Sequence, residues 1–496
     1  MTTNEAFYAY QSAETIRRLI PDPNLSQMWL RVAKACGPLP AVTDQGVTLT
    51  YGELDEAVGR FRALLAGYAL ACGGTVCMLA ERSADFLKAF LAAETLGLAV
   101  VVMPTYLPPE DIADFAERFG AKLLLVDGAN REKALAASAR GIPALAIEAS
   151  SAETAAPCTD FSGSQTAILM FTGGTTGIPK GTKLSHDCAM EGILNGCYGY
   201  EPVFQQKYLL VLPLSHVFGL VRSVLTPLYT GSEIVICRDP KKMFEMCLTY
   251  SPTIAVLVPL LVERGITLSR QYGRNMFGDR FRYIITGAAP VASHLDRECA
   301  ALGITLCPGY GLTETACLVS GNPDVLRKPD SVGLLFPNQE VRFVDGELQL
   351  RGKNLFSGYT DDVETALAYD DGWFRTGDIA RLDEDGFLYI LGRKKEMLLL
   401  SNGENIYPAV VEQRFNALEE VQECQLYVTA DEDGREILAL DVLPRAASPE
   451  ALMERLNEVN CSLPRFQQAR KIVIRTEDFP RTASLKMIRY GLQKGE

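Results

Sequence analysis

The feature that most constrains this chain is a glycine- and threonine-rich stretch, 171–181, between an apolar run and a helix start. The apolar run, Thr166–Met170, is typical of a buried strand in a parallel sheet. Beyond the stretch, Ser185 can cap a helix that begins near Asp187. The pattern therefore predicts a loop that joins a strand to a helix, as in α/β domains.

The composition of this loop suits a bound polyphosphate. Glycines let backbone N–H groups approach an anion closely, threonine hydroxyls add donors, and a lysine supplies positive charge. The loop residues expected to contact phosphate are Thr172, Gly173, Gly174, Thr175, Thr176, Gly177 and Lys180. A P-loop places glycine directly before its lysine, but Pro179 stands there, so a P-loop NTPase is disfavoured. For the loop alone, a surface turn is the alternative.

Five further segments follow the loop in order: Gly309–Glu314, Gly358–Tyr359, Thr376–Asp378, Gly392–Lys395 and Pro480–Lys486. With the loop, they resemble the ordered signatures of the acyl-adenylate-forming superfamily, which contains acyl-CoA synthetases, luciferases and the adenylation domains of peptide synthetases. The resemblance implies that ATP and Mg²⁺ are used to convert a carboxylic acid to acyl-AMP with release of pyrophosphate.

The chain organisation fits this resemblance. At 496 residues the chain is too long for one ordinary core, and strand and helix patterns alternate up to about residue 390, as in a parallel sheet wrapped by helices. The resemblance implies a large multi-sheet α/β domain over 1–393 and a small mobile α+β domain over 394–496. The short charged segment Arg393–Lys395 is the expected hinge.

Charge and cysteine content exclude several other classes. A net charge of −13 argues against nucleic-acid binding through a generally basic surface. Thirteen cysteines without a C-x-x-C pair, and only three histidines, make a zinc site improbable. With neither a signal peptide nor a membrane-spanning apolar run in the sequence, we expect reduced cysteines, mostly in the core, and a cytoplasmic enzyme.

The Gly309–Glu314 segment is expected to bind nucleotide and metal. Mg²⁺ prefers few carboxylates together with water and phosphate oxygens, and the resemblance assigns Glu314 to the metal and Thr313 to the α-phosphate. Tyr310 would lie against adenine, and Gly311 is expected among the nucleotide-binding residues. For a lone Thr-Glu pair, a helix-start cap is the alternative.

The ribose and the adenine have further expected partners. By resemblance, Asp378 accepts both ribose hydroxyls and Arg393 adds a contact from the hinge side, next to Lys395. A turn cap is the alternative for the aspartate. The small residues expected beside a flat adenine or an acyl chain are Gly287, Ala288 and Ala289.

Two residues are expected at the reacting acid. Lys486 matches the superfamily's C-terminal lysine, which reaches the carboxylate oxygen and the α-phosphate where charge builds up; its neighbour Leu485 departs from the usual glycine. His216, in a P-x-x-H-x-x-G pattern similar to that of acyl- and aryl-CoA synthetases, would line the acyl pocket, with a core histidine as the alternative. No aspartate lies in Leu212–Val221, which disfavours amino-acid activation.

The acceptor is expected to be coenzyme A. The segment around Gly403 resembles the loop of fatty acyl-CoA synthetases that borders the pantetheine tunnel. We therefore predict a ligase for a fatty or other apolar acid, within fatty acid metabolism. The alternatives are a stand-alone ligase that loads a separate carrier protein and a non-catalytic nucleotide- or acyl-binding relative. The sequence predicts no oligomeric state.

Overall fold

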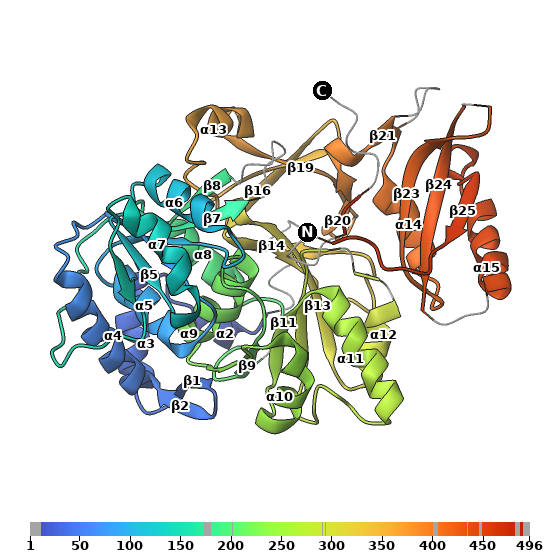
Figure 1. The fold of residues 1–496 in the computed structure, drawn as a ribbon. Coiled ribbons are helices and arrows are strands. Elements are labelled where there is room, and N and C mark those ends of the chain that lie inside the picture. Colours follow the sequence, from blue (N-terminus) through green and yellow to red (C-terminus); the bar gives the residue numbers. More distant parts are fainter. Residues whose placement is uncertain are drawn as a thin grey trace.

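The computed structural model describes residues 11–172, 180–200, 202–289, 291–292, 294–399, 405–433, 435–445, 449–481 and 487–489. A large body formed by the N-terminal four-fifths of the chain carries a small C-terminal domain at one side (Figure 1). The helices are α2 (Ala13–Arg18), α3 (Leu25–Cys36), α4 (Tyr51–Ala66), α5 (Ala84–Glu94), α6 (Pro109–Arg118), α7 (Arg131–Ala139), α8 (His186–Asn195), α9 (Thr226–Tyr229), α10 (Met243–Tyr250), α11 (Pro259–Tyr272), α12 (His294–Ala301), α13 (Asp362–Ala368), α14 (Pro408–Asn416) and α15 (Pro449–Ser462).

One six-stranded sheet has the order β6-β5-β3-β4-β7-β8. Its strands are β3 (Thr75–Leu79), β4 (Ala99–Val102), β5 (Leu123–Val126), β6 (Ala144–Ala146), β7 (Thr166–Thr172) and β8 (Lys180–Ser185). Alternate residues of a strand feed two separate cores: Val76 and Met78 enter one, and Cys77 and Leu79 enter the other. Because both faces are covered, these strands read as continuous apolar runs.

A second sheet of fourteen strands begins with a mostly parallel half. Its strands are β1 (Pro40–Asp44), β2 (Val47–Thr50), β9 (Lys207–Leu210), β10 (Glu233–Ile236), β11 (Ile254–Leu257), β12 (Tyr283–Thr286) and β13 (Thr305–Leu312). Strand β13 has two parts: Thr305–Pro308 pairs parallel with β12, and Gly309–Leu312 pairs antiparallel with β14. This strand therefore joins the parallel half to an antiparallel half.

The antiparallel half was not foreseen, because the sequence was interpreted as uninterrupted α/β up to about residue 390. Its strands are β14 (Cys317–Gly321), β15 (Gly333–Leu335), β16 (Gln339–Val344), β17 (Glu347–Gly352), β18 (Tyr369–Asp370), β19 (Trp373–Leu382) and β20 (Phe387–Arg393). Strand β19, for example, alternates buried with more exposed positions over part of its length, and β16 has no fully buried position. That pattern is weaker than the apolar runs of the parallel strands.

The phosphate-loop region also differs from expectation. Ser185 caps α8 as predicted, and its side chain accepts a hydrogen bond from the N–H of Cys188. However, β8 lies between the loop and the helix and pairs antiparallel with β7. The loop therefore joins two strands of a hairpin, so that Thr172 and Lys180 face each other as Cα partners at its base.

The small C-terminal domain has its own core. A three-stranded sheet of β23 (Val421–Ala430), β24 (Glu436–Pro444) and β25 (Lys471–Ile474) packs with α14 and α15 (Figure 1). The two-residue strands β21 (Leu398–Leu399) and β22 (Asn405–Ile406) pair beside it. Its buried cluster, which includes Phe415 and Leu440, is separate from the cores of the large body.

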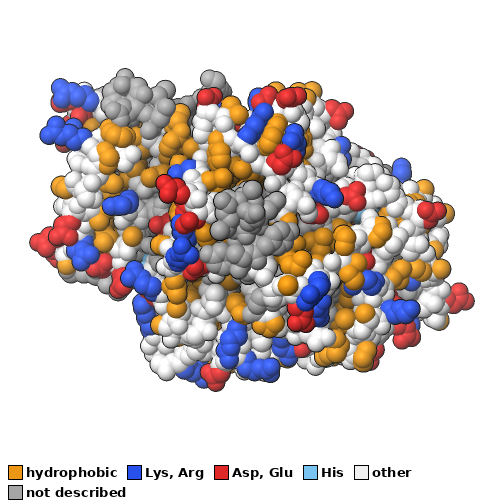
Figure 2. Space-filling view, turned by 180° about the vertical axis from the view of Figure 1, so that it is seen from behind, with side chains coloured by type: hydrophobic (Ala, Val, Ile, Leu, Met, Phe, Trp, Pro, Cys, Tyr) orange, Lys and Arg blue, Asp and Glu red, His pale blue; other side chains and the backbone are white. Residues whose placement is uncertain are grey.

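Two broader expectations concern cysteines and membranes. All thirteen cysteines are free thiols and nine are buried, which agrees with core positions. Over the described residues, no helix is long and apolar enough to cross a membrane. On the face shown in Figure 2, the coloured acidic and basic side chains are mixed with one another and do not form one basic region.

A buried carboxyl group lies where α5 meets α8. Glu94 is 1% exposed, and neither carboxyl oxygen has a hydrogen-bond partner among the described residues. The nearest ring nitrogen is Nδ1 of His186, 3.7 Å from Oε2, but burial lowers the pKa of His186 to about 4, so the ring is neutral. Burial raises the pKa of Glu94 well above its ordinary value. Glu94 is therefore a neutral acid in the folded protein at neutral pH.

This burial predicts a pH-dependent effect of Glu94→Gln. The unfolded chain releases the Glu94 proton above its ordinary pKa of about 4.5, whereas the folded chain retains it. Stability therefore falls as pH rises, with a limiting slope of about 1.4 kcal/mol per pH unit. Glutamine does not titrate. The Tm of Glu94→Gln minus the Tm of the unsubstituted protein should therefore increase between pH 5 and pH 8.

Thermal unfolding at several pH values measures this gain. The exposed Glu56→Gln is the control for loss of a carboxylate, and we expect it to follow the unsubstituted protein at each pH. A Tm difference for Glu94→Gln that stays constant from pH 5 to pH 8 would contradict the assignment.

Candidate active site

Three segments meet at the carboxylate of Asp378. This residue lies in β19, opposite Arg393 of β20, and is 2% exposed. Arg393 Nε lies 2.8 Å from Oδ1, and the hydroxyl of Tyr310, from β13, donates to Oδ2 at 2.5 Å. The structure thus brings together the predicted ribose ligand, the predicted hinge-side arginine and the predicted adenine neighbour.

The charge of this cluster is set by two opposing effects. Burial raises the pKa of Asp378, while Arg393 and the hydrogen bond from Tyr310 act to lower it, and the net direction is upward. For Arg393, burial lowers the pKa but Asp378 raises it, and the guanidinium remains charged. An ionised carboxylate has about four lone-pair positions. Two donors already present therefore leave acceptor capacity for two more.

Glu347 of β17 supports this cluster, and the sequence did not indicate it. The backbone N–H of Gly377, at φ +70°, donates to Oε1 of Glu347 at 3.2 Å. Lys394 Nζ lies 2.8 Å from Oε2 of the same side chain. One carboxylate thus holds both the turn before Asp378 and the residue after Arg393. This role of Glu347 becomes visible only when sheet pairing places it beside Gly377 and Lys394.

Glu314 lies just beyond β13, in the short 3-10 helix η4 (Thr313–Thr315). The hydroxyl of Tyr359 donates to its Oε1 at 2.7 Å, and Oε2 has no hydrogen bond within the described ranges. No group of three or more potential metal-ligating side chains occurs in those ranges. A single carboxylate with one free oxygen fits Mg²⁺ that keeps water and phosphate ligands, rather than an all-protein cage.

Tyr359 also links Glu314 to the phosphate loop. Lys180, the last predicted loop residue, has its Nζ 5.3 Å from the centroid of the Tyr359 ring, and it pairs with Glu364 of α13. Tyr359 forms an isolated β-bridge with Thr182 of β8. The predicted metal ligand and the predicted phosphate-binding lysine therefore flank one tyrosine, which was noted in the sequence only as part of a motif.

Glycine is required where the Gly287–Ala289 segment meets β13. A Cβ on Gly287 would lie 2.9 Å from the carbonyl oxygen of Gly309, and one on Gly311 would lie 1.5 Å from that of Cys317. Such separations exclude a side chain at either position, because real Cβ atoms do not approach backbone so closely. Ala288 adopts φ +66°. Two predicted adenine segments thus lie side by side.

His216 lies two residues before Phe218, whose ring is near Gly287. It precedes the π-helix η2 (Phe218–Leu225), and its backbone N–H donates to the carbonyl oxygen of Pro213 at 3.3 Å. The ring of Phe218 would be 3.7 Å from a Cβ on Gly287. The sequence did not predict the π-helix, a rare element that often occurs at functional sites.

The remaining predicted residues are not brought to this cluster by described contacts. Lys395 is exposed in η5 (Lys394–Glu396). Outside the described residues lie Gly173, Gly174, Thr175, Thr176, Gly177, Gly403 and Lys486.

Comparison with known proteins identifies the family. Residues 30–360 match the AMP-binding enzyme family. The chain therefore belongs to this family of adenylate-forming enzymes, as its motifs indicated.

Named relatives and solved structures cover nearly the whole chain. A 2-succinylbenzoate–CoA ligase from Geobacillus kaustophilus is 30% identical over 477 residues, which span 92% of this chain and 94% of that protein. A long-chain-fatty-acid–CoA ligase from Mycobacterium tuberculosis is 28% identical over 478 residues, spanning 90% and 93%. The crystal structure of ATP-bound MatB from Rhodopseudomonas palustris has a TM-score of 0.82 and 25% identity, and the match covers 94% of this chain and 97% of that one.

The hydrogen bond from Tyr359 to Glu314 predicts a specific defect. Tyr359→Phe keeps the ring beside Lys180 but removes the donor that orients the carboxylate. Loss of a supporting hydrogen bond to a metal ligand typically lowers affinity or activity 10- to 100-fold. We expect ATP–pyrophosphate exchange to need on the order of 10-fold more Mg²⁺ for half-maximal rate.

Tyr369→Phe is the matched control. The Tyr369 hydroxyl donates to the carbonyl oxygen of Phe356 at 3.1 Å, rather than to the Glu314 carboxylate. We expect its Mg²⁺ dependence to match that of the unsubstituted enzyme. Equal Mg²⁺ requirements in both variants would show that the Tyr359 hydroxyl does not orient a metal ligand.

Proposed function

We propose that this enzyme activates a carboxylic acid as acyl-AMP and then transfers the acyl group to coenzyme A. The observation that carries the proposal is the convergence of Tyr310, Asp378 and Arg393 beside the Glu314–Tyr359 pair. As an acid–thiol ligase of the adenylate-forming family, the enzyme uses ATP, Mg²⁺ and coenzyme A. Relatives named as CoA ligases support the choice of acceptor.

In the proposed first step, an oxygen of the acid attacks the α-phosphorus of ATP and the bond to the β-phosphate oxygen breaks, releasing pyrophosphate. Asp378 would accept the ribose hydroxyls with its remaining lone pairs, and Tyr310 would lie against the adenine. Glu314 would hold Mg²⁺, which supplies charge neutralisation at the phosphates. Lys180 and Lys486 would supply positive charge at the phosphates and at the acid oxygen.

In the proposed second step, the thiol sulfur of coenzyme A attacks the acyl carbonyl carbon, and AMP leaves. Lys486 and Gly403 belong to the same C-terminal region but serve different steps, so we propose that the small domain rotates between them. Arg393 and Lys394 are anchored on the large body through Asp378 and Glu347. Lys395, by contrast, is exposed. The hinge is therefore proposed at Lys395, with the domain boundary after Arg393.

Two substitutions should separate the steps. Lys486→Ala should slow ATP–pyrophosphate exchange by several orders of magnitude and spare thioester formation from supplied acyl-AMP, because it removes charge needed only in adenylation. Lys395→Pro restricts φ at the proposed hinge, so it should spare exchange and slow thioester formation. Rates of both half-reactions are measured for each variant.

Lys395→Ala is the control, because it removes the same side chain without restricting the backbone. The proposed roles are wrong if Lys486→Ala affects both half-reactions equally, or if Lys395→Pro transfers the acyl group as fast as Lys395→Ala.

The acceptor is tested separately, because coenzyme A and a carrier protein present the same pantetheine thiol. Coenzyme A adds a phosphorylated nucleotide, and exposed Arg470 and Lys471 on the small domain offer cationic contacts of the kind it needs. We expect saturable acyl-CoA formation with kcat/KM well above that for pantetheine. Poor turnover of both thiols, together with fast loading of an acyl carrier protein, would instead establish the carrier-protein alternative.

A further inference from the structure

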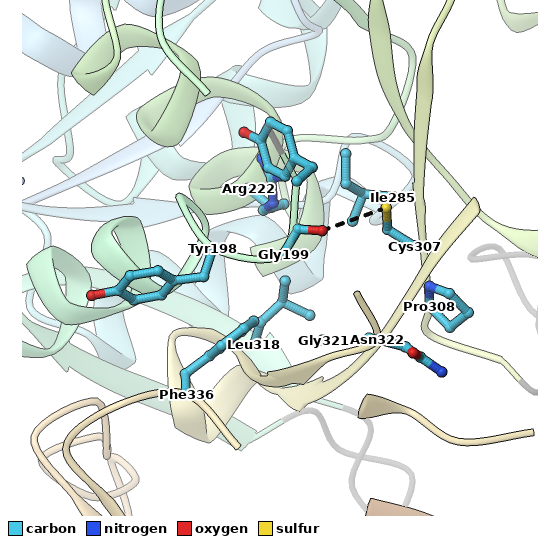
Figure 3. Close-up of a pocket in the computed structure, with 12 residues that line it drawn as sticks. Tyr198, Gly199, Arg222, Ile285, Cys307, Pro308, Leu318, Gly321, Asn322 and Phe336 are labelled. Carbon is cyan, nitrogen blue, oxygen red and sulfur yellow. Dashed lines mark hydrogen bonds between the residues drawn. The ribbon is translucent and has the colours of Figure 1, made fainter. Parts of the chain in front are cut away.

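A small cavity adjoins the segment that starts the nucleotide site. It is bounded by Cys307, Pro308 and Gly309 of β13, next to Ile285 of β12, and by the stretch that follows α8 (Figure 3). Gly309 is the first residue of the Gly309–Glu314 segment, and its carbonyl oxygen faces Gly287. The cavity therefore borders the segment where Gly309 meets Gly287.

Arg222 lines this cavity as a buried charge without a counter-ion. The residue is 1% exposed. Its Nε and Nη1 atoms are buried without a hydrogen-bond partner, and none of the ion pairs found among the described residues involves it. A guanidinium stays protonated in proteins, and buried charges are normally paired. Arg222 departs from that rule.

The groups around Arg222 supply no negative charge at neutral pH. Its guanidinium carbon lies 5.2 Å from the ring centroid of Tyr200 and 5.9 Å from that of Tyr208, and the two tyrosine hydroxyls bond to each other. Burial raises the pKa of both phenols. Burial also raises the pKa of the Cys197 and Cys307 thiols to about 12. All four groups are neutral, so the guanidinium is held only by the ring faces and by side-chain hydrogen bonds to the two phenols, without an anionic partner.

The surrounding backbone is arranged to accommodate this side chain. Gly196 leaves space for its stem, since a Cβ there would lie 3.2 Å from Cδ of Arg222. The π-helix that carries it is supported by two side-chain bonds to carbonyl oxygens five residues earlier, from Ser223 to Phe218 and from Thr226 to Val221. The backbone around Arg222 thus leaves room for its side chain and fixes the helix that carries it.

Other buried arginines of the chain are satisfied. Arg82 is 7% exposed and donates to the carbonyl oxygens of Cys237 and Arg238 at 2.6 and 2.8 Å. Arg62 donates to the carbonyl oxygen of Ala155 at 2.7 Å. Among these arginines, the unsatisfied Nε and Nη1 atoms are therefore particular to Arg222, in the wall of the cavity.

We propose that Arg222 binds a second carboxylate at the far end of the acid substrate, so that the enzyme prefers a dicarboxylic acid to an apolar monocarboxylic one. This proposal rests on the proposed function and replaces the sequence-based expectation of a fatty acid. An apolar chain entering the cavity would leave Nε and Nη1 without acceptors and the charge without a counter-ion, whereas a carboxylate would accept charge-assisted hydrogen bonds from the guanidinium.

The test measures ATP–pyrophosphate exchange with matched acids. Linear and aromatic dicarboxylic acids are compared with their half methyl esters and with monocarboxylic acids of equal length. A site built to bond a substrate group rejects the analogue that lacks it by as much as 10⁴-fold. We expect kcat/KM for the best diacid to exceed that for its half ester at least about 100-fold, and we expect Arg222→Leu to lower this ratio to about 1.

Arg82→Leu is the matched control, because it also removes a buried arginine but lies outside the cavity. We expect it to keep the diacid-to-half-ester ratio. Thermal unfolding without ATP provides a second readout: the preferred diacid should raise the Tm of the unsubstituted protein and of Arg82→Leu, but not of Arg222→Leu.

The outcomes distinguish the two proposals. If none of the acids supports ATP–pyrophosphate exchange, the proposed ligase function is overturned. The diacid-dependent Tm shift then decides the role of Arg222 alone. If half esters react as well as diacids, or if Arg222→Leu keeps the ratio and the Tm shift, Arg222 does not bind substrate. In that case the ligase assignment stands without it.

Discussion

The candidate site depends on one buried carboxylate. Asp378 is held by Arg393 from the neighbouring strand and by Tyr310 from β13, so its position fixes the relation between the antiparallel half of the large sheet and the Gly309–Glu314 segment. Because a buried carboxylate without partners would be protonated, the two donors are also what keeps its oxygens available as acceptors. Glu347 extends the same arrangement to Gly377 and Lys394.

The buried ionisable groups of this molecule differ in how their burial is compensated. Asp378 has two donors, whereas Glu94 has none and is neutral in the fold. Arg222 cannot be neutralised in the same way, because a guanidinium does not lose its proton in proteins. A carboxyl group can thus be buried alone by changing its protonation state, but an arginine needs a partner. For Arg222, that partner is proposed to be the substrate.

Much of the fold was readable from local pattern. Strand β7 begins at Thr166 and Ser185 caps α8, as predicted, since apolar runs and helix starts are encoded by neighbouring residues. Strand β8 was missed because its residues, Lys180–Ser185, carry no apolar run, and they form a strand only through pairing with β7. The continuation of β13 through Gly309–Leu312 was missed because glycines are poor strand formers, although close backbone approach requires them here.

The sequence by itself determined the family and the order of the motifs, and it singled out Glu314, Asp378 and Arg393 as candidates, because fixed residue types at fixed spacings are typical of phosphate and ribose binding. The tertiary structure alone decided which residues support them. Tyr359 reaches Glu314 from 45 residues away, Glu347 reaches Gly377 from 30, and Arg222 lies beside Tyr200 across a separate element. Such contacts arise from sheet pairing and packing between distant segments, and no local periodicity encodes them.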